Sequence, residues 1–164
     1  MTVRPFAPGD VDACAALLLE IPLWRQYRLT PERARAVFGR VARGEAHAYV
    51  ADDAGCLLGC VVYSLRGTFD HSGYIRLLAV AEGAQGKGVG SRLLGAAEEA
   101  IFRTGPNVFL LVTATNAHAR RFYERRGYRP AGDIPDYLCR GITEVLYRKT
   151  LGPIYPDDPG GGET

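Results

Sequence analysis

The sequence contains no apolar run long enough to cross a membrane, and its first ten residues lack the apolar stretch of a secretory signal. An excess of one charge is also missing, because 20 Lys and Arg side chains are balanced by 18 Asp and Glu, for a net charge of +2. This balance gives no electrostatic reason to bind nucleic acid or a membrane surface. We therefore expect a cytoplasmic protein with neither of these partners.

Spacings typical of metal sites and redox pairs are equally scarce. The nearest two of the four cysteines, Cys56 and Cys60, are separated by three residues, whereas zinc ribbons and redox motifs separate them by two. The three histidines, His47, His71 and His118, are scattered along the chain. We expect reduced thiols, as is usual inside cells, and no metal ion.

The chain does contain enough apolar material for one core, since 47% of its 164 residues are hydrophobic. We expect a single domain over residues 1–150. Residues 151–164 include three prolines, four glycines and three acids, a composition that cannot build a core. We expect this segment to be a flexible tail.

Hydrophobic periodicity predicts an α/β protein with the order β-α-α-β-β-β-α-β-α-β-β. Asp10 is expected to cap the first helix and Thr30 the second, while residues 66–72 are expected to be a polar connection. A strand, a helix and a buried strand follow one another over residues 75–113, which predicts a parallel strand pair. The expected strands cover residues 2–6, 46–52, 56–65, 75–80, 107–113, 129–134 and 142–150, and the expected helices begin at residues 11, 31, 89 and 117.

A glycine-rich turn joins the fourth expected strand to the third helix. Gly86, Gly88 and Gly90 alternate within Gln85–Gly90, so the backbone can turn tightly there and approach a ligand closely. The helix that follows begins with unpaired N–H groups and the positive end of its dipole, which favours an anion such as phosphate. A nucleotide P-loop is disfavoured because Gly88 stands where that motif needs Ser or Thr. A dinucleotide fingerprint would use Ser91 in place of its third glycine, and no convincing ribose-binding acid follows about 20 residues later. An ordinary turn without a ligand is the plain alternative.

A second informative stretch, NAHARRFYERRGY, covers residues 116–128. Asn116 suits a helix N-cap and Gly127 a helix end. At helical spacing, Asn116, Ala119 and Tyr123 share one face, and the small residue between two polar ones suits a face against which a ligand lies. The alternative is an ordinary amphipathic helix with two core aromatics, which we accept for Phe122 but not for Tyr123.

Together these two stretches resemble the GNAT superfamily, the GCN5-related N-acetyltransferases. Gln85-x-x-Gly88-x-Gly90 resembles its pyrophosphate-binding signature, and the helix at residues 116–128 resembles its N-x-x-A-x-x-F-Y-x-x-x-G-F/Y segment. The resemblance covers residues 1–150 and implies a mixed, mostly antiparallel sheet of about seven strands with about four helices, splayed between strands four and five. It implies that acetyl-CoA binds in this splay as cosubstrate, with no metal. The implied contacts are Leu78, Ala79 and Val80 for pantetheine, Gln85, Gly86, Lys87, Gly88, Val89, Gly90 and Ser91 for the pyrophosphate, and Asn116 with Tyr123 for the pantetheine and sulfur end.

The resemblance also implies the chemistry, in which an amine attacks the thioester directly. Tyr123 is the expected general acid for the leaving thiolate, and a backbone N–H near Leu78 is the expected oxyanion donor. The glutamate that some members place on the fourth strand as general base is missing here, and Glu20, His71, Asp136 or a water chain stay open. The acceptor is expected to be a small-molecule amine or a peptide N-terminus, and homodimers are common in the family. A non-catalytic acyl-CoA-binding sensor is the alternative function.

Overall fold

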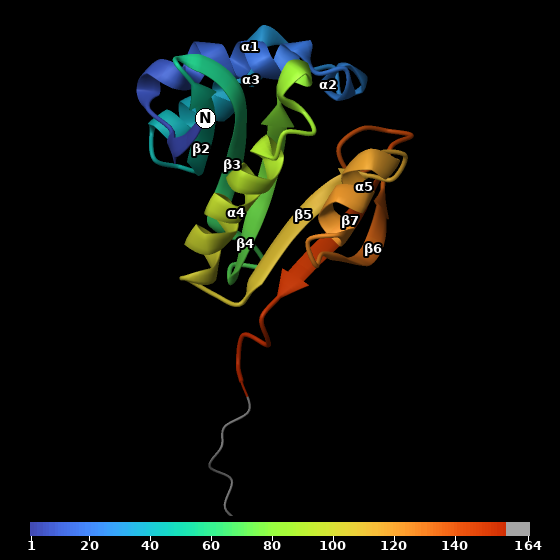
Figure 1. Cartoon of the computed structure of the whole chain (residues 1–164). Coiled ribbons are helices and arrows are strands. Elements are labelled where there is room, and N and C mark those ends of the chain that lie inside the picture. The colour runs from blue at the N-terminus through green and yellow to red at the C-terminus, as the bar shows by residue number, and fades with distance from the viewer. Residues whose placement is uncertain (157–164) are drawn as a thin grey trace, which may run out of the picture.

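The computed structural model describes residues 1–156, and the remainder of the expected tail, residues 157–164, lies outside the described residues. Seven strands form one sheet in the order β1-β2-β3-β4-β5-β7-β6 (Figure 1). The strands are β1 (Thr2–Pro5), β2 (His47–Asp53), β3 (Cys56–Thr68), β4 (Ser72–Val80), β5 (Asn107–Thr113), β6 (Arg129–Pro135) and β7 (Thr143–Thr150). The helices are α1 (Val11–Glu20), the one-turn α2 (Leu23–Gln26), α3 (Pro31–Ala42), α4 (Val89–Phe102) and α5 (Ala117–Glu124). The expected element order and sheet class are confirmed, with α2 and two short 3₁₀ turns added.

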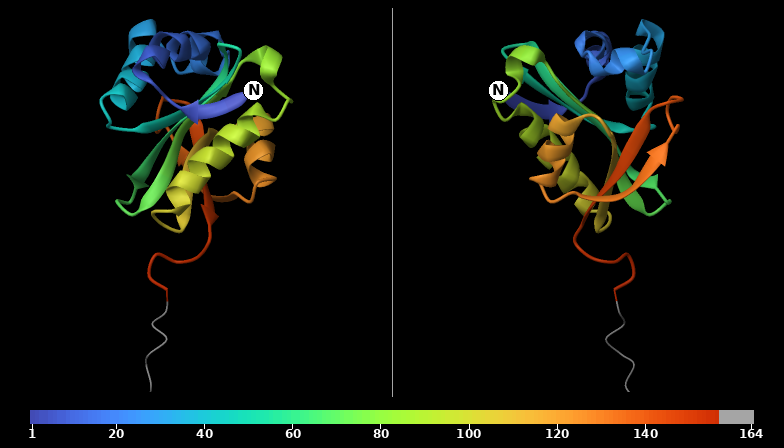
Figure 2. Two further views of the ribbon diagram at one scale, coloured as in Figure 1. Left: turned by 60° about the vertical axis from the view of Figure 1, so that its left-hand side comes forward. Right: turned by 90° about the vertical axis from the view of Figure 1, so that its right-hand side faces the viewer.

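Helices cover both faces of the sheet and divide the core into two clusters (Figure 2). The first cluster joins α1 and α3 to one face of β2–β4, with Cys14, Leu18 and Phe38 among its fully buried members. The second joins α4, Tyr123 of α5 and the opposite face of the sheet, including β5 and β7. None of the helices within residues 1–156 is long and apolar enough to cross a membrane.

The two halves of the sheet separate between β4 and β5. These strands run parallel but pair only at Gly73–Val108, Tyr74–Phe109 and Ile75–Leu110. Beyond these pairs the edge of β4 that faces β5 has no strand partner, while β5 continues its antiparallel pairing with β7 as far as Thr113. The expected parallel pair and the splay are thus confirmed, and Figure 1 shows the two strands diverging toward the end of the molecule that carries α2.

Two local expectations were wrong. Asp10 does not cap α1, because both of its carboxylate oxygens accept hydrogen bonds from the Arg4 guanidinium, at 2.8 and 2.9 Å. A bidentate pair between a guanidinium and a carboxylate is among the stronger side-chain hydrogen-bonded pairs, because both partners are charged. Residues 66–72 are not a simple connection either, since β3 runs on to Thr68 and turns into β4 through Phe69 and Asp70, both at positive φ.

The α4 helix is held tightly against β4. As its periodicity predicts, Val89, Leu93, Ala97 and Ile101 are all buried. A Cβ added at Gly73 would lie 2.1 Å from Cγ2 of Ile101, which is far inside van der Waals contact. Glycine is therefore needed at residue 73 because the helix approaches the strand so closely.

Replacing Gly73 by Ala should lower the free energy of unfolding by about 1–3 kcal/mol, the usual cost of overpacking a core. Urea unfolding of the variant measures this loss. Adding Ile101→Ala should remove the clash, so the two substitutions together should cost less than the sum of their separate costs. Gly95→Ala is the matched control, because its Cβ would meet nothing within 4 Å on the exposed side of α4. The tight packing would be contradicted if Gly73→Ala lost no more stability than Gly95→Ala and if the costs of Gly73→Ala and Ile101→Ala simply added.

Candidate functional site

A cleft occupies the splay between β4 and β5, and it brings together residues from both halves of the sheet. Its walls combine hydrophobic and aromatic side chains with a few polar groups, the usual composition of a small-molecule site. Helix α2 contributes Trp24, the residue after it contributes Tyr27, and the loop before β7 contributes Leu138. The remaining lining residues that matter here are Tyr74, Arg76, Leu78, Thr113, Asn116, Ala119, Tyr123 and Glu144.

The expected pantetheine-binding strand lines this cleft only in part. Leu78 lies in the wall, whereas the side chain of Ala79 is buried in the cluster beneath α1 and offers a ligand only its backbone. Val80 is half-buried against the α4 side. The pairing with β3 skips Arg76, because Val62 pairs with Leu77 and Tyr63 with Ile75. Such a bulge re-aims the backbone beside a site, as an oxyanion donor near Leu78 would require.

The glycine-rich turn has the open geometry that its sequence predicts. Gly86 and Gly88 adopt φ of +74° and +82°, and a Cβ on either would meet nothing within 4 Å. Gly88 is the N-cap of α4, so the first N–H groups of this 14-residue helix open toward the turn. Gln85 donates from its side chain to the carbonyl of Val80 at 3.4 Å, which folds the turn back on β4.

Gly90 and Val89 serve packing as well as the turn. A Cβ on Gly90 would lie 3.5 Å from the Phe122 ring and from Val80, so this glycine sits where α4, α5 and β4 meet. The Val89 side chain is buried in the core. Of the residues expected to contact the pyrophosphate, these two can therefore contribute only backbone or bare Cα groups.

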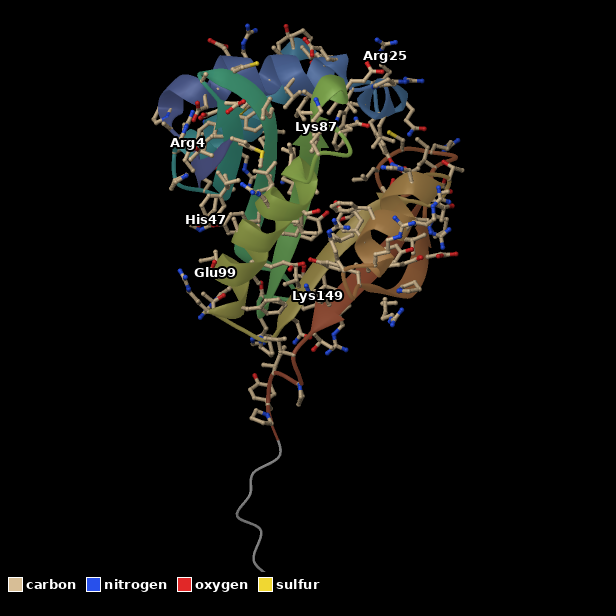
Figure 3. The ribbon with its side chains drawn as sticks, viewed as in Figure 1. Arg4, Arg25, His47, Lys87, Glu99 and Lys149 are labelled. Atoms are coloured by element: carbon tan, nitrogen blue, oxygen red, sulfur yellow. The ribbon has the colours of Figure 1, made fainter. Side chains whose placement is uncertain are left out.

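Positive charge gathers beside the start of α4. Lys87 is exposed in the turn (Figure 3). Arg126, which follows α5, donates to the hydroxyl of Ser91 and to the carbonyl of Phe122, and its guanidinium lies 3.6 Å above the Phe122 ring. A cation at a helix N-terminus adds to the anion preference of the dipole. Arg126 was not predicted, because only the fold brings the end of α5 beside the start of α4.

Helix α5 presents its predicted face to the cleft. Asn116 Oδ1 accepts from the N–H of Ala119 at 3.1 Å, so the N-cap expectation is confirmed, and Asn116, Ala119 and Tyr123 all line the cleft. The Tyr123 ring packs edge-to-face with Phe122 and Tyr128, at centroid distances of 5.1 and 5.5 Å. Its hydroxyl makes no hydrogen bond to any residue that the structure describes. Burial raises the pKa of this hydroxyl above its ordinary value, so it holds its proton at neutral pH.

The carboxylate that the structure places in the cleft is Glu144 on β7. It is 2% exposed, lies directly across from Thr113 on β5, and accepts a hydrogen bond from the hydroxyl of Tyr27. The pKa of the Tyr27 hydroxyl is raised to about 12, mainly by burial and secondly by its hydrogen bond to Glu144. Sequence reasoning missed Glu144 because alternation in β7 cannot say that the face shared by Glu144 and Leu146 borders a cleft.

The base candidates from the sequence do not line this cleft. Glu20 borders a separate hollow between α1 and the turn after β4. His71 is exposed and packs edge-to-face with Tyr155, and Asp136 is exposed with its carboxylate accepting from the N–H of Gly141 at 2.6 Å. The geometry therefore supports none of these three open candidates as the general base.

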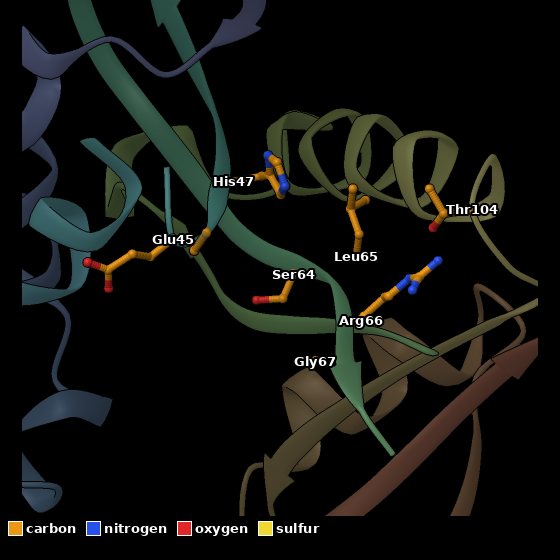
Figure 4. Close-up of a pocket in the computed structure, with 8 residues that line it drawn as sticks. Glu45, His47, Ser64, Leu65, Arg66, Gly67 and Thr104 are labelled. Carbon is orange, nitrogen blue, oxygen red and sulfur yellow. The ribbon is translucent and has the colours of Figure 1, made fainter. Parts of the chain in front are cut away.

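A larger hollow of about 550 Å³ lies elsewhere, where the start of β2 and the last part of β3 meet Thr104, shortly after α4 (Figure 4). Its lining includes Glu45, His47, Arg66 and Thr104. Glu45 is already paired with Arg40 and Arg43. None of the predicted site residues borders this hollow, so size alone does not make it the candidate site.

Within residues 1–156 no three His, Cys, Asp or Glu side chains are grouped closely enough to hold a metal ion. The four cysteines are free thiols, with Cys14 and Cys60 buried. The arrangement therefore places an unpaired strand edge, a protonated tyrosine and a buried carboxylate around one cleft, with a glycine-rich turn at the N-terminus of α4 following the same strand.

Comparison with known proteins identifies the family of the chain. A model of the Acetyltransferase (GNAT) family matches residues 14–128. An uncharacterised N-acetyltransferase of Methanocaldococcus jannaschii is 30% identical over 152 residues, which is 91% of each chain. Blasticidin-S acetyltransferase of Streptomyces morookaense is 37% identical over 103 residues, covering 63% of this chain and 73% of that protein.

Solved structures show the same fold. An aminoglycoside 6′-N-acetyltransferase complexed with coenzyme A superposes with a TM-score of 0.76 at 20% identity, covering 96% of this chain and all of the other. Ribosomal-protein-alanine N-acetyltransferase from Brucella melitensis gives a TM-score of 0.75 at 21% identity, covering 92% of this chain and all of the other. At these identities the likeness concerns the fold rather than the substrate.

Proposed function

The chain belongs to the GNAT family of acetyltransferases, and on that basis we propose that it moves the acetyl group of acetyl-CoA to a primary amine. One observation carries the proposal: the cleft between β4 and β5 joins an unpaired strand edge to the hydroxyl of Tyr123, beside a glycine turn at a helix N-terminus. A thioester with a pyrophosphate tail needs these features together. A relative 37% identical over 103 residues is named for acetylating blasticidin S, a further reason to expect an amine acceptor.

The residues present suit the cosubstrate. The edge of β4 beyond Ile75 is free to pair with the amides of pantetheine, near Leu78, Ala79 and Val80. The open Cα positions of Gly86 and Gly88 leave room for phosphate against backbone N–H groups from Gln85 through Ser91, including those of Lys87, Val89 and Gly90. Asn116 keeps its side-chain N–H₂ for the cosubstrate, since its oxygen is already used as the cap.

Tyr123 is the group we assign to the leaving sulfur. An amine that attacks the thioester carbonyl expels a thiolate, which leaves more easily when a donor stabilises it. The Tyr123 hydroxyl is protonated at neutral pH, lies in the cleft and has no protein acceptor among the described residues. Mere binding of the cosubstrate does not need a proton donor at the sulfur, so the position of Tyr123 favours a transferase over a binding module.

The test has two measurements: the melting temperature with and without acetyl-CoA, and thiol release from acetyl-CoA in the presence of a panel of amines. The panel contains blasticidin S, an alkyl diamine and a peptide with an alanine N-terminus. We expect acetyl-CoA to raise the melting temperature, because a ligand bound only to the folded state stabilises it by about 2.7 kcal/mol at a hundredfold excess over Kd. We further expect amine-dependent thiol release with at least one acceptor.

The control replaces acetyl-CoA by ATP, which should leave the melting temperature unchanged. Stabilisation by acetyl-CoA without any amine-dependent thiol release would favour the binding module instead. No stabilisation at millimolar acetyl-CoA would remove the proposed cosubstrate altogether.

A further inference from the structure

The cleft contains one acidic side chain whose burial needs an explanation. Glu144 is 2% exposed and lies on the central strand of the second half of the sheet, between Thr113 of β5 and Ile134 of β6. It borders the same cleft as Tyr123. Acidic side chains are almost never fully buried unless they are paired, because the interior solvates a charge poorly.

Glu144 has no cationic partner within the described part of the chain. No Lys, Arg or His nitrogen lies within 4.0 Å of its carboxylate. Arg76 borders the same cleft, yet it forms no ion pair with Glu144. The protein therefore presents this carboxyl group to the cleft without a cationic partner, which is unusual for a buried acidic side chain.

Two hydroxyl groups hold this carboxylate in place. The Tyr27 hydroxyl has one proton and donates it to Oε1 of Glu144, so its contact with the Thr113 hydroxyl has Thr113 as the donor. This chain of hydrogen bonds runs from β5 through Tyr27, which follows α2, to β7, and it fixes one oxygen of Glu144. The other oxygen, Oε2, makes no hydrogen bond to a described residue, which leaves it free for a ligand.

We propose that Glu144 is the binding site and proton acceptor for the ammonium group of the acceptor, with Tyr27 as its positioning residue. This rests on the proposed transferase function. The missing cation beside Glu144 is the protonated amine itself, and Trp24, Tyr27 and Tyr74 supply aromatic walls that suit a cation. The acceptor class is therefore an amine that is positively charged in solution, such as an alkylamine.

The proton balance of the reaction requires such a group. An alkylammonium has a pKa of about 10 and cannot attack until it loses a proton. In our proposal the ammonium gives one proton to Glu144, and its lone pair then forms the C–N bond while the C–S bond breaks. Tyr123 gives its proton to the departing sulfur, which keeps the electron pair of the C–S bond. The second nitrogen proton restores Tyr123 through solvent, and Glu144 releases its proton, so the sum is an amide, a thiol and one proton.

The deciding experiment compares Glu144→Gln with the wild type, using the alkylamine found in the panel and its aminooxy analogue. Gln can still accept from Tyr27 but cannot take a proton. The aminooxy group is neutral at pH 7 and needs no base before it attacks. We expect kcat/KM for the alkylamine to fall by about 10²- to 10⁴-fold, the usual worth of a general base. For the aminooxy analogue we expect a loss of no more than about tenfold.

Two further variants serve as a control and as a second test. Glu99→Gln makes the same change on the exposed face of α4 (Figure 3) and should leave both rates unchanged. Tyr27→Phe removes the hydroxyl that orients Glu144, so it should reduce the alkylamine rate by about tenfold and spare the aminooxy rate. Tyr27→Phe also serves as the test if Glu144→Gln does not fold.

Stabilisation by acetyl-CoA should be the same in all four proteins, which checks that each variant is folded. If Glu144→Gln lowers kcat/KM equally with both acceptors, Glu144 has only a structural role and the proposal is overturned. Full activity of this variant with the alkylamine would overturn it too. Either result would leave the transferase function in place. A wild-type protein that acetylates no amine would instead remove the proposed function, and the role of Glu144 with it.

Discussion

Replacing Tyr123 by Phe is expected to lower kcat by about 10²- to 10⁴-fold, because a general acid commonly contributes this much to a proton-transfer step. The affinity for acetyl-CoA should hardly change, since at most one hydrogen bond of about 0.5–1.5 kcal/mol is lost. Folding should be spared, because the ring keeps its packing against Phe122 and Tyr128 and the hydroxyl has no partner among the described residues. Steady-state kinetics and equilibrium binding of acetyl-CoA separate these effects.

The matched control is Tyr128→Phe. This neighbouring tyrosine is fully buried in the same cluster, and its hydroxyl has no hydrogen-bond partner within residues 1–156 and does not line the cleft. It should therefore retain near-normal kcat. If Tyr123→Phe were as active as Tyr128→Phe, the assignment of Tyr123 as acid would be wrong, while the cosubstrate assignment would stand. A loss below tenfold would mean that water protonates the sulfur or that another step limits the rate.

Replacing Gly88 by Val is expected to weaken acetyl-CoA binding by about 10- to 100-fold. A valine side chain at the N-cap of α4 would stand where phosphate meets the backbone, and charge-assisted hydrogen bonds contribute about 1.5–3 kcal/mol each. Gly88 also has a φ of +82°, so a side chain there strains the folded state by about 1–2 kcal/mol. Binding must therefore be measured by calorimetry well below the melting temperature of the variant.

The hairpin between β2 and β3 supplies the control for this strain. Gly55 has a φ of +83°, and a Cβ there would also meet nothing within 4 Å. Gly55→Val should therefore lose similar stability and bind acetyl-CoA like the wild type. Gly90→Val is a poorer test than Gly88→Val, because its side chain would press on Phe122 and Val80 and disturb packing as well as the turn. Equal affinities for Gly88→Val and Gly55→Val would mean that the glycine-rich segment is only a turn.

The sequence by itself determined the elements and their order. Local interactions set these features, as the buried stripe from Val89 to Ile101 and the cap of Thr30 on α3 illustrate. The strand–helix–strand unit also fixed the parallel pairing of β4 and β5, because a crossover through a helix brings the second strand back in the same direction. The two motifs predicted the anion-binding turn and the face of α5 for the same reason: each lies within one short segment.

The tertiary structure alone decided which residues from distant segments share the cleft. Glu144 meets Tyr27 across 117 positions of sequence, and Arg126 meets Ser91 across 35. No local pattern encodes these contacts, because they depend on strand register and on where the sheet stops pairing. The miss at Asp10 is of shorter range, since its carboxylate binds the guanidinium of Arg4, six residues earlier in the chain. Periodicity assigns a residue to a face, but only the packed sheet shows that the face of β7 carrying Glu144 borders the site where β4 and β5 separate.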